Sequence, residues 1–362
     1  MKKLLLICLL GLFAITLVDA CTTFVLNDSV DLVYGRNYDF DLGSGFIVIN
    51  KSGIEKQAFV PPPNEPANWT SKYGSITFNQ IGIDAPMGGM NEKGLTIAQM
   101  ALFETKYPEI NNKKIVNQLE WIQYQLDNSA LLSDVIENNS KIQIVPTSIP
   151  VHYMVCDSLG NIGVFEFLNG ELIIHQGVDV TIPVCSNITY EDSKKTLEEY
   201  EGFGGDKVIP RIWDNASDIV IIANSMIDNY INITDRNPID YSFKILETVG
   251  SKTRTQWSIV FDIKNKAINF KTLNNKNIRV LRVNDLISSQ DNSENKINIL
   301  DIQIYDINSP VNEQFQNLTK ESYFKYKRDL YIWSKTNIEG FPDLSDEIIN
   351  MEVEYLVNRK CK

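Results

Sequence analysis

The chain has 362 residues, of which 34 are lysine or arginine and 46 are aspartate or glutamate, so its formal net charge is −12 at pH 7. This acidic balance, with no basic cluster, argues against nucleic acid or an anionic membrane surface as a partner. Only two histidines are present, and the sequence has no His-Glu-x-x-His helix, Cys-x-x-Cys pair or Gly-x-Ser-x-Gly turn, so we expect no metal site and no cofactor.

The first twenty residues have the pattern of a secretory signal. Two lysines precede an apolar run over 4–18, and the small residue Ala20 follows. The apolar run is too short for a stop-transfer helix. We therefore predict that residues 1–20 are removed, that the protein is secreted, periplasmic or lumenal, and that Cys21 is the first residue of the mature chain. Removal takes away two lysines and one aspartate and leaves a net charge of −13.

An N-terminal cysteine combines two reactive groups on one residue. Its thiol titrates near ~8.5 and its α-amine near ~8, so the amine can act as a general base near neutral pH. Cys21 is therefore a candidate nucleophile that carries its own base. Two alternatives stay open. Cys21 could be a lipid anchor, which Asp19 and the lack of a flexible tether disfavour, or cleavage falls elsewhere and Cys21 is a buried thiol.

Two strand-like runs, 21–26 and 31–35, flank the turn-forming residues Asn-Asp-Ser-Val. A turn centred on this segment pairs positions that sum to 57 and places Arg36 opposite Cys21, roughly 5 Å away at Cβ. At that range the guanidinium would lower the pKa of the thiol, and Asp39 could hold the α-ammonium. The alternatives are a surface ion pair of small effect, or a one-residue slip that turns Arg36 to the other face.

Hydrophobic periodicity predicts blocks of strands that alternate with pairs of helices along the rest of the chain. We expect further strands at 46–50, 75–80, 85–100 (a hairpin), 150–156, 161–167, 171–175, 182–186, 256–263 and 266–272. We expect helices at 114–127, 131–137, 191–201, 217–230, 239–249, 319–333 and 345–358.

Several histidines and cysteines are interpreted as structural rather than catalytic residues. His152 and His175 lie in strand-like runs and are expected to pack there rather than to catalyse. If Cys21 stays free, the remaining cysteines of the mature chain, Cys156, Cys185 and Cys361, form an odd set for an oxidising compartment. Cys156 and Cys185 either pair or, as we favour, are buried thiols.

The opening motifs resemble those of a known family. Cys-Thr-Thr-Phe at 21–24, followed by Gly-Arg-Asn-Tyr-Asp at 35–39, is similar to the start of the choloylglycine hydrolase and penicillin V acylase family. Four later segments resemble the family's in the same order, at 89–95, 152–157, 185–189 and 256–262. The resemblance implies an α+β protein with the four-layer αββα fold of N-terminal-nucleophile hydrolases. It also implies a single domain over 21–362, in which 284–362 is a C-terminal extension without a recognisable motif.

The resemblance further implies a reaction and its residues. Cys21 would attack the carbonyl of a linear amide and form a thioester, and Arg36 and Asp39 fall on the family's active-site arginine and aspartate. Asn187 falls on the side-chain donor that stabilises the oxyanion, a group whose loss typically costs ~10²–10³ in rate. Asn187 also begins an Asn-Ile-Thr sequon, so glycosylation is the alternative. The partner implied is a small N-acyl amide, and homo-oligomers are left open.

The sequence departs from the family pattern at two positions. Ala101 falls where relatives carry Asn or Tyr, and Asp218 falls where they carry another arginine, which Arg211 or Arg254 could replace. These departures leave the acyl group open among bile acids, penicillins, acyl homoserine lactones, N-acyl amino acids and ceramide-like lipids. No substrate-binding residue is identified. The rival functions are a lipid-anchored, non-catalytic binding protein on this scaffold and an N-terminal-nucleophile dipeptidase.

Overall fold

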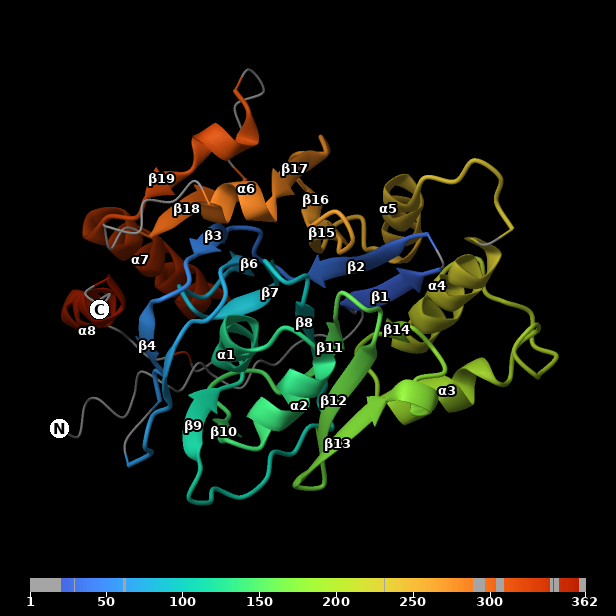
Figure 1. Ribbon diagram of the computed structural model, residues 1–362, viewed down its shortest axis with the longest axis horizontal. Coiled ribbons are helices and arrows are strands. Elements are labelled where there is room, and N and C mark those ends of the chain that lie inside the picture. Colours follow the sequence, from blue (N-terminus) through green and yellow to red (C-terminus); the bar gives the residue numbers. More distant parts are fainter. Residues whose placement is uncertain are drawn as a thin grey trace.

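Two antiparallel sheets, stacked face to face, form the centre of the computed structural model (Figure 1). The structure describes residues 21–28, 30–60, 63–230, 232–288, 297–303, 309–338, 341 and 345–357. The predicted leader, 1–20, and Cys361 therefore lie outside the described residues.

The smaller sheet has six strands and contains the opening hairpin. Its strands in spatial order are β14 (Val184–Cys185), β1 (Thr22–Asn27), β2 (Leu32–Asp39), β15 (Thr255–Asp262), β16 (Ala267–Thr272) and β17 (Arg279–Arg282). The larger sheet has nine strands, in the order β13 (Glu171–Gln176), β12 (Ile162–Leu168), β11 (Val151–Cys156), β8 (Thr96–Ala101), β7 (Pro86–Asn91), β6 (Ser75–Asn79), β3 (Phe46–Asn50), β18 (Asn298–Asp301) and β19 (Gln316–Asn317).

Strand β3 illustrates how the larger sheet is buried on both faces. Ile47 and Ile49 belong to the core between the two sheets, whereas Phe46 and Val48 pack against the C-terminal helices. Because successive side chains of a strand point to opposite faces, one strand can serve both cores.

Helices cover the outer face of each sheet (Figure 1). On the larger sheet, α1 (Glu120–Asn128) packs on β7 and β8 with α2 (Leu132–Asn139) beside it, and α7 (Lys320–Asn337) and α8 (Asp346–Val357) pack over β3. On the smaller sheet, α4 (Ala216–Tyr230) and α5 (Pro238–Val249) cover β1 and β2, with α3 (Tyr190–Leu197) against α4. This arrangement confirms the αββα prediction.

Minor elements complete the chain. They are the helix α6 (Val283–Ser288), the 3₁₀ turns Gly177–Asp179 and Val311–Gln314, the parallel pair β9 (Lys114–Asn117) and β10 (Ile142–Val145), and the hairpin β4 (Glu55–Gln57) and β5 (Asn68–Thr70). Within the described part of the chain, no helix has both the length and the apolar composition needed to cross a membrane.

The helix predicted at 114–127 begins six residues later than expected, at Glu120. Its first residues instead form β9, because Ile115 and Val116 pair in parallel with β10. Asn117 then accepts hydrogen bonds from the backbone N–H groups of Leu119 and Glu120 at 3.0 and 2.9 Å, which starts the helix as a capping asparagine does. The apolar spacing alone could not separate the strand from the helix.

The register of the opening hairpin also differs from the prediction. Thr22 pairs with Asn37 and Thr23 with Arg36, so paired positions sum to 59 rather than 57. The turn is displaced because Asp28 accepts hydrogen bonds from the N–H groups of both Val30 and Asp31. A two-residue shift preserves the alternation of faces, so Arg36 stays on the face that the prediction gave it.

Candidate active site

Four strand ends of the smaller sheet meet at one cavity. Cys21 precedes β1, Asp39 ends β2, Arg254 precedes β15, and Asn187 follows β14, and all four residues line this cavity. Because these neighbouring strands are antiparallel, the start of one lies beside the end of the next. The topology therefore gathers residues from positions 21 to 254 at a single edge of the sheet.

Cys21 is held by both its side chain and its backbone. It is 7% exposed, its Sγ lies 3.7 Å from the backbone oxygen of Asp39, and its own carbonyl accepts a hydrogen bond from Ser186 Oγ at 2.9 Å. Burial raises the pKa of the Cys21 thiol to about 11, the negative charge of Asp39 adds to the rise, and Arg36 and Arg254 oppose it. Arg36 thus lowers the thiol pKa as predicted, but desolvation outweighs the guanidinium and the net pKa of the thiol is raised.

Arg36 lies beside the cavity as a buried cation. It is 1% exposed, and its Nη1 donates to the carbonyl of Gln99 at 2.7 Å. Its Nε and Nη2 have no hydrogen-bond partner among the described residues, although the guanidinium lies 5.5 Å from the ring centre of Tyr38. Buried polar groups without partners are costly and rare, so this one is a candidate for interaction with a bound molecule.

Asp39 and Asn187 complete the predicted set. Asp39 Oδ1 accepts a hydrogen bond from the hydroxyl of Thr255, which fixes the carboxylate next to Cys21. The buried Oδ1 of Asn187 has no partner within the described part of the chain. The structure thus places Cys21, Asp39 and Asn187 around one cavity with Arg36 beside it, and their catalytic roles stay predictions.

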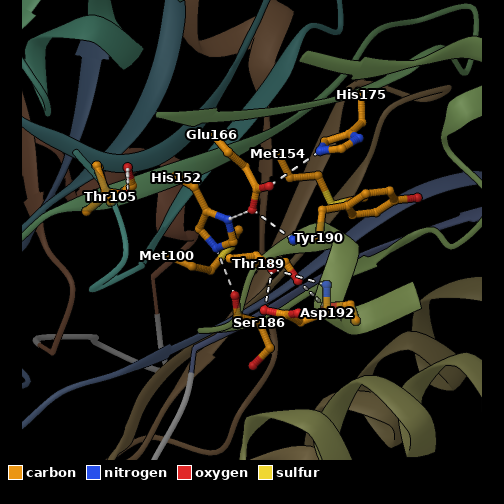
Figure 2. Close-up of polar contacts among 12 residues, drawn as sticks. Met100, Thr105, His152, Met154, Glu166, His175, Ser186, Thr189, Tyr190 and Asp192 are labelled. Carbon is orange, nitrogen blue, oxygen red and sulfur yellow. Dashed lines mark hydrogen bonds and ion pairs between the residues drawn. The ribbon is translucent and has the colours of Figure 1, made fainter. Parts of the chain in front are cut away.

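A buried polar network is centred on His152 and Glu166 in the larger sheet and reaches Ser186 (Figure 2). His152 on β11 places its Nε2 2.8 Å from the carbonyl oxygen of Ser186 and its Nδ1 3.0 Å from Glu166 Oε1. Glu166 Oε1 also accepts the N–H of Tyr190 at 2.9 Å, and His175 Nε2 lies 3.4 Å from Oε2. Burial by itself would raise the pKa of Glu166, but hydrogen bonds from the two histidines lower it to about 2.

The histidines therefore occupy strands, as predicted, and His152 is fully buried. Cys156 and Cys185 are free and buried, so the interpretation as buried thiols is confirmed and a disulfide between them is excluded. Burial raises the pKa of each thiol above its ordinary value. Among the described residues, no group of three or more His, Cys, Asp or Glu side chains could hold a metal ion.

The structure distinguishes between the two arginines that could replace the one missing at position 218. Asp218 accepts hydrogen bonds from the N–H of Asp214 and the amide of Asn215 at the start of α4. Arg211 is exposed, whereas Arg254 lines the cavity and pairs with Asp41 at 2.9 Å. Arg254 is therefore the arginine of this pair that belongs to the site.

The rest of the cavity is mainly apolar and was not predicted. Ala101 borders it, as the resemblance implied. Its other apolar or aromatic lining residues are Tyr38, Phe40, Ile81, Met87, Phe103, Leu119, Ile149, Val151, Leu330 and Trp333. Motifs give no signal for these residues, because only the packing of distant segments brings them together.

Comparison with known proteins identifies relatives of this chain. A family model described as linear amide C–N hydrolases, choloylglycine hydrolase family, matches residues 21–219. A penicillin V acylase from Pectobacterium atrosepticum is 27% identical over 253 residues, which cover 62% of this chain and 65% of the acylase. The match thus spans just under two thirds of the length of that relative.

Solved structures share the fold. The penicillin V acylase from Agrobacterium tumefaciens superposes with a TM-score of 0.70 at 24% identity and covers 83% of this chain and 98% of its own. A mutant of the conjugated bile acid hydrolase from Clostridium perfringens gives a TM-score of 0.63 at 20% identity and covers 79% of this chain and 97% of its own. In both comparisons, part of this chain has no counterpart in the solved structure.

Proposed function

This chain belongs to the choloylglycine hydrolase family of linear amide C–N hydrolases, and we propose that it cleaves the amide bond of small N-acyl compounds through a thioester on Cys21. The observation that carries the proposal is the position of Cys21, directly before β1 and in the wall of the cavity. The α-nitrogen of a cysteine is three bonds from its sulfur. Cleavage after Ala20 would therefore create an amine beside the thiol.

Acylation begins with proton transfer from the thiol to this amine. The thiol is protonated at neutral pH while Cys21 is still joined to Ala20, because burial raises its pKa to about 11. A new α-ammonium would lower the thiol pKa by direct charge interaction, which favours the thiolate. The thiolate attacks the amide carbon, and the carbonyl oxygen becomes an oxyanion that the side-chain amide of Asn187 stabilises.

Collapse of this intermediate breaks the C–N bond. The α-ammonium gives its proton to the departing nitrogen, the free amine leaves, and the acyl group stays on Cys21 as a thioester. The α-amine then takes a proton from water, the hydroxide attacks the thioester, and the carboxylic acid leaves with the thiol restored. Asp39 orients the α-amine, and the buried charge of Arg36 stabilises the thiolate.

Export and removal of residues 1–20 are part of the proposal, since the mechanism requires a free amine on Cys21. The rival of a non-catalytic, lipid-anchored protein drew its main support from the missing arginine at position 218. Arg254 in the cavity wall removes that support.

Intact mass and N-terminal sequencing of the protein from its own secretory route test the maturation step. We expect an unmodified chain that begins at Cys21. A thioether lipid with detergent partitioning, or a start at any other residue, would contradict the mechanism.

Activity of the mature chain tests the chemistry. The wild type should release amine from an N-acyl amide, and Cys21→Ala should abolish turnover while the circular dichroism spectrum stays unchanged. Incubation of the wild type with substrate and rapid acid quenching should add the mass of the acyl group to Cys21. Turnover by Cys21→Ala at the wild-type rate would refute the proposal. A preference for peptides with free amino termini would instead favour the dipeptidase.

A further inference from the structure

A second cavity lies beside the one that contains Cys21. The two cavities share Ile81, Leu119 and Ser148 in their linings, and the second has a volume of about 80 Å³, more than a single water molecule occupies. Helices α7 and α8 contribute to its lining and lie outside residues 21–219, the segment that the family model matches. The motifs of the family therefore do not account for this cavity.

Glu120, at the start of α1, places a buried carboxyl group in the lining of the second cavity. It is 3% exposed, its Oε1 accepts the N–H of Phe59 at 2.7 Å, and its Oε2 accepts the N–H of Asn117 at 3.2 Å. These bonds fix the carboxyl group but bring no positive charge to it. Burial raises the pKa of Glu120 to about 8, and the two backbone N–H groups oppose the rise. A carboxyl group perturbed in this way inside a cavity is a candidate for ligand binding.

The other titratable groups of this lining are already matched with one another. Lys327 Nζ forms an ion pair with Glu352 of α8 and donates to the carbonyl of Ile81 at 2.9 Å. The hydroxyl of Tyr331 also donates to Glu352. In the described part of the lining, Glu120 is thus the carboxyl group without a counter-ion, and its ionised form is costly unless a cation enters the cavity.

The lining favours one kind of cation. A primary ammonium group has three N–H donors and needs only a few acceptors, which the oxygens of Glu120 and Ser148 can supply. A metal ion would need more ligands, and among the described residues no group of three or more His, Cys, Asp or Glu side chains could hold one. The apolar side chains of Ile83 and Ala85 complete a wall that suits a short alkyl chain.

We propose that the second cavity binds a primary alkylammonium group, for which Glu120 is the counter-ion. The proposal goes beyond the amide hydrolysis proposed above and does not depend on it. When the ammonium group binds, it donates hydrogen bonds to the carboxylate, and the proton that Glu120 holds at pH 7 passes to the solvent. The ammonium group belongs either to the acyl group of a substrate that also occupies the Cys21 cavity or to another amine.

Ethylammonium chloride is the probe that tests the binding. The full chain carries ¹³C-labelled glutamate carboxyl groups, so that NMR reports the pKa of Glu120, and the signal missing from Glu120→Gln assigns this residue. We expect saturating ethylammonium to lower the pKa of Glu120 by about one unit or more, which is a tenfold change in proton affinity. Ethanol, a neutral molecule of the same size, and potassium chloride at the same ionic strength should leave this pKa unchanged.

The affinity for ethylammonium should depend on pH in one direction. Because the proton and the ammonium group compete for Glu120, the dissociation constant should fall about tenfold per unit between pH 6 and pH 8 and level off above the pKa of about 8. Glu120→Gln should bind about tenfold more weakly at pH 8 and lose this dependence.

A second variant keeps the test valid if Glu120→Gln does not fold. Ala85→Leu should fill the cavity and abolish binding while the carboxyl group of Glu120 stays in place. Glu137→Gln is the matched control, because the side chain of Glu137 on α2 is 71% exposed. No effect of ethylammonium on Glu120, an equal effect of potassium, or wild-type affinity in Ala85→Leu would overturn the proposal.

Two amides of 7-amino-4-methylcoumarin identify the source of the ammonium group. One carries a 6-aminohexanoyl group and the other a 6-hydroxyhexanoyl group. A kcat/KM about tenfold higher for the aminohexanoyl amide, lost in Glu120→Gln, assigns the ammonium group to the acyl part of the substrate. Equal values for the two amides, with ethylammonium binding intact, assign it to another amine. A chain that binds ethylammonium but hydrolyses no N-acyl amide would refute the proposed function and leave the binding site intact.

Discussion

The cavity that contains Cys21 has two unlike sides, one made of strand ends and the other of helix α7. The strand side places charged and polar groups within two residues of a strand terminus, so the sheet fixes their positions directly. The helix side supplies apolar side chains from about three hundred residues further along the chain, and only tertiary packing fixes them. The groups to which we assign the chemistry therefore all lie on the strand side, whereas the helix side adds mainly apolar surface.

Removing the side chain that we assign to the oxyanion should give the largest effect and tests the strand side. Asn187→Ala should lower kcat by ~10²–10³ with KM nearly unchanged, because the donor acts on charge that develops only in the transition state. Steady-state kinetics on one amide measure both constants. A variant that changes KM and leaves kcat intact would place Asn187 among substrate-binding residues, and would remove the division between the two sides.

The second cavity, lined by residues of both α1 and α7, should have its own effect on stability. Glu120, at the start of α1, lines this cavity together with Lys327 of α7, and burial raises its pKa to about 8. The folded state therefore holds a proton that the unfolded state loses near pH 4.5. Stability from this residue should be complete below pH 4.5 and fall by a few kcal/mol as pH rises towards about 8.

Urea unfolding at pH 5 and pH 8 measures this dependence. Glu120→Gln should flatten it, even if the amide costs some stability at low pH through a lost acceptor. Glu166→Gln is the contrasting variant, since the pKa of Glu166 is lowered to about 2 and its charge does not change over this range. An unaltered pH dependence in Glu120→Gln would show that another group causes it.

A smaller effect is expected at Gly35, inside the hairpin that carries Arg36. A Cβ at this position would lie 2.2 Å from the ring of Phe24, which is fully buried. Gly35→Ala should therefore destabilise the protein by about 1–3 kcal/mol through overpacking. Thermal unfolding measures the loss. The double variant Gly35→Ala, Phe24→Leu should recover part of it, and no recovery would mean that the strain lies in the backbone.

The smallest expected effect is a change in KM on substitution of Arg254, a residue of the strand side. Its guanidinium lines the cavity, so Arg254→Gln should raise KM roughly three- to tenfold for amides whose amine carries a carboxylate, and leave uncharged amines unaffected. Arg211→Gln is the control, because Arg211 is exposed and does not line the cavity. Equal effects on charged and uncharged amines would assign Arg254 to the chemistry instead.

The two sides also differ in what the sequence could predict. The hairpin register was displaced by two residues, yet Arg36 was placed on the correct face because strand geometry repeats every two residues. Helix α7 was predicted over 319–333 and observed at Lys320–Asn337. That Trp333 and Cys21 line the same cavity could not be predicted, because no local pattern encodes the packing of segments so far apart. The sequence analysis also did not pair His152 with Glu166, although the two residues are only 14 positions apart on the neighbouring strands β11 and β12.

The buried position of Cys21 has a consequence for the maturation that we propose. A signal peptidase must bind the chain on both sides of the bond it cuts, and on one side that segment would be Cys21–Thr22–Thr23. In the folded protein Thr22 and Thr23 are paired in the sheet, and Cys21 is 7% exposed. If residues 1–20 are removed after Ala20, the cut must therefore come before the sheet closes. A chain that folded first would keep its thiol but would not gain the amine, and it would be inactive.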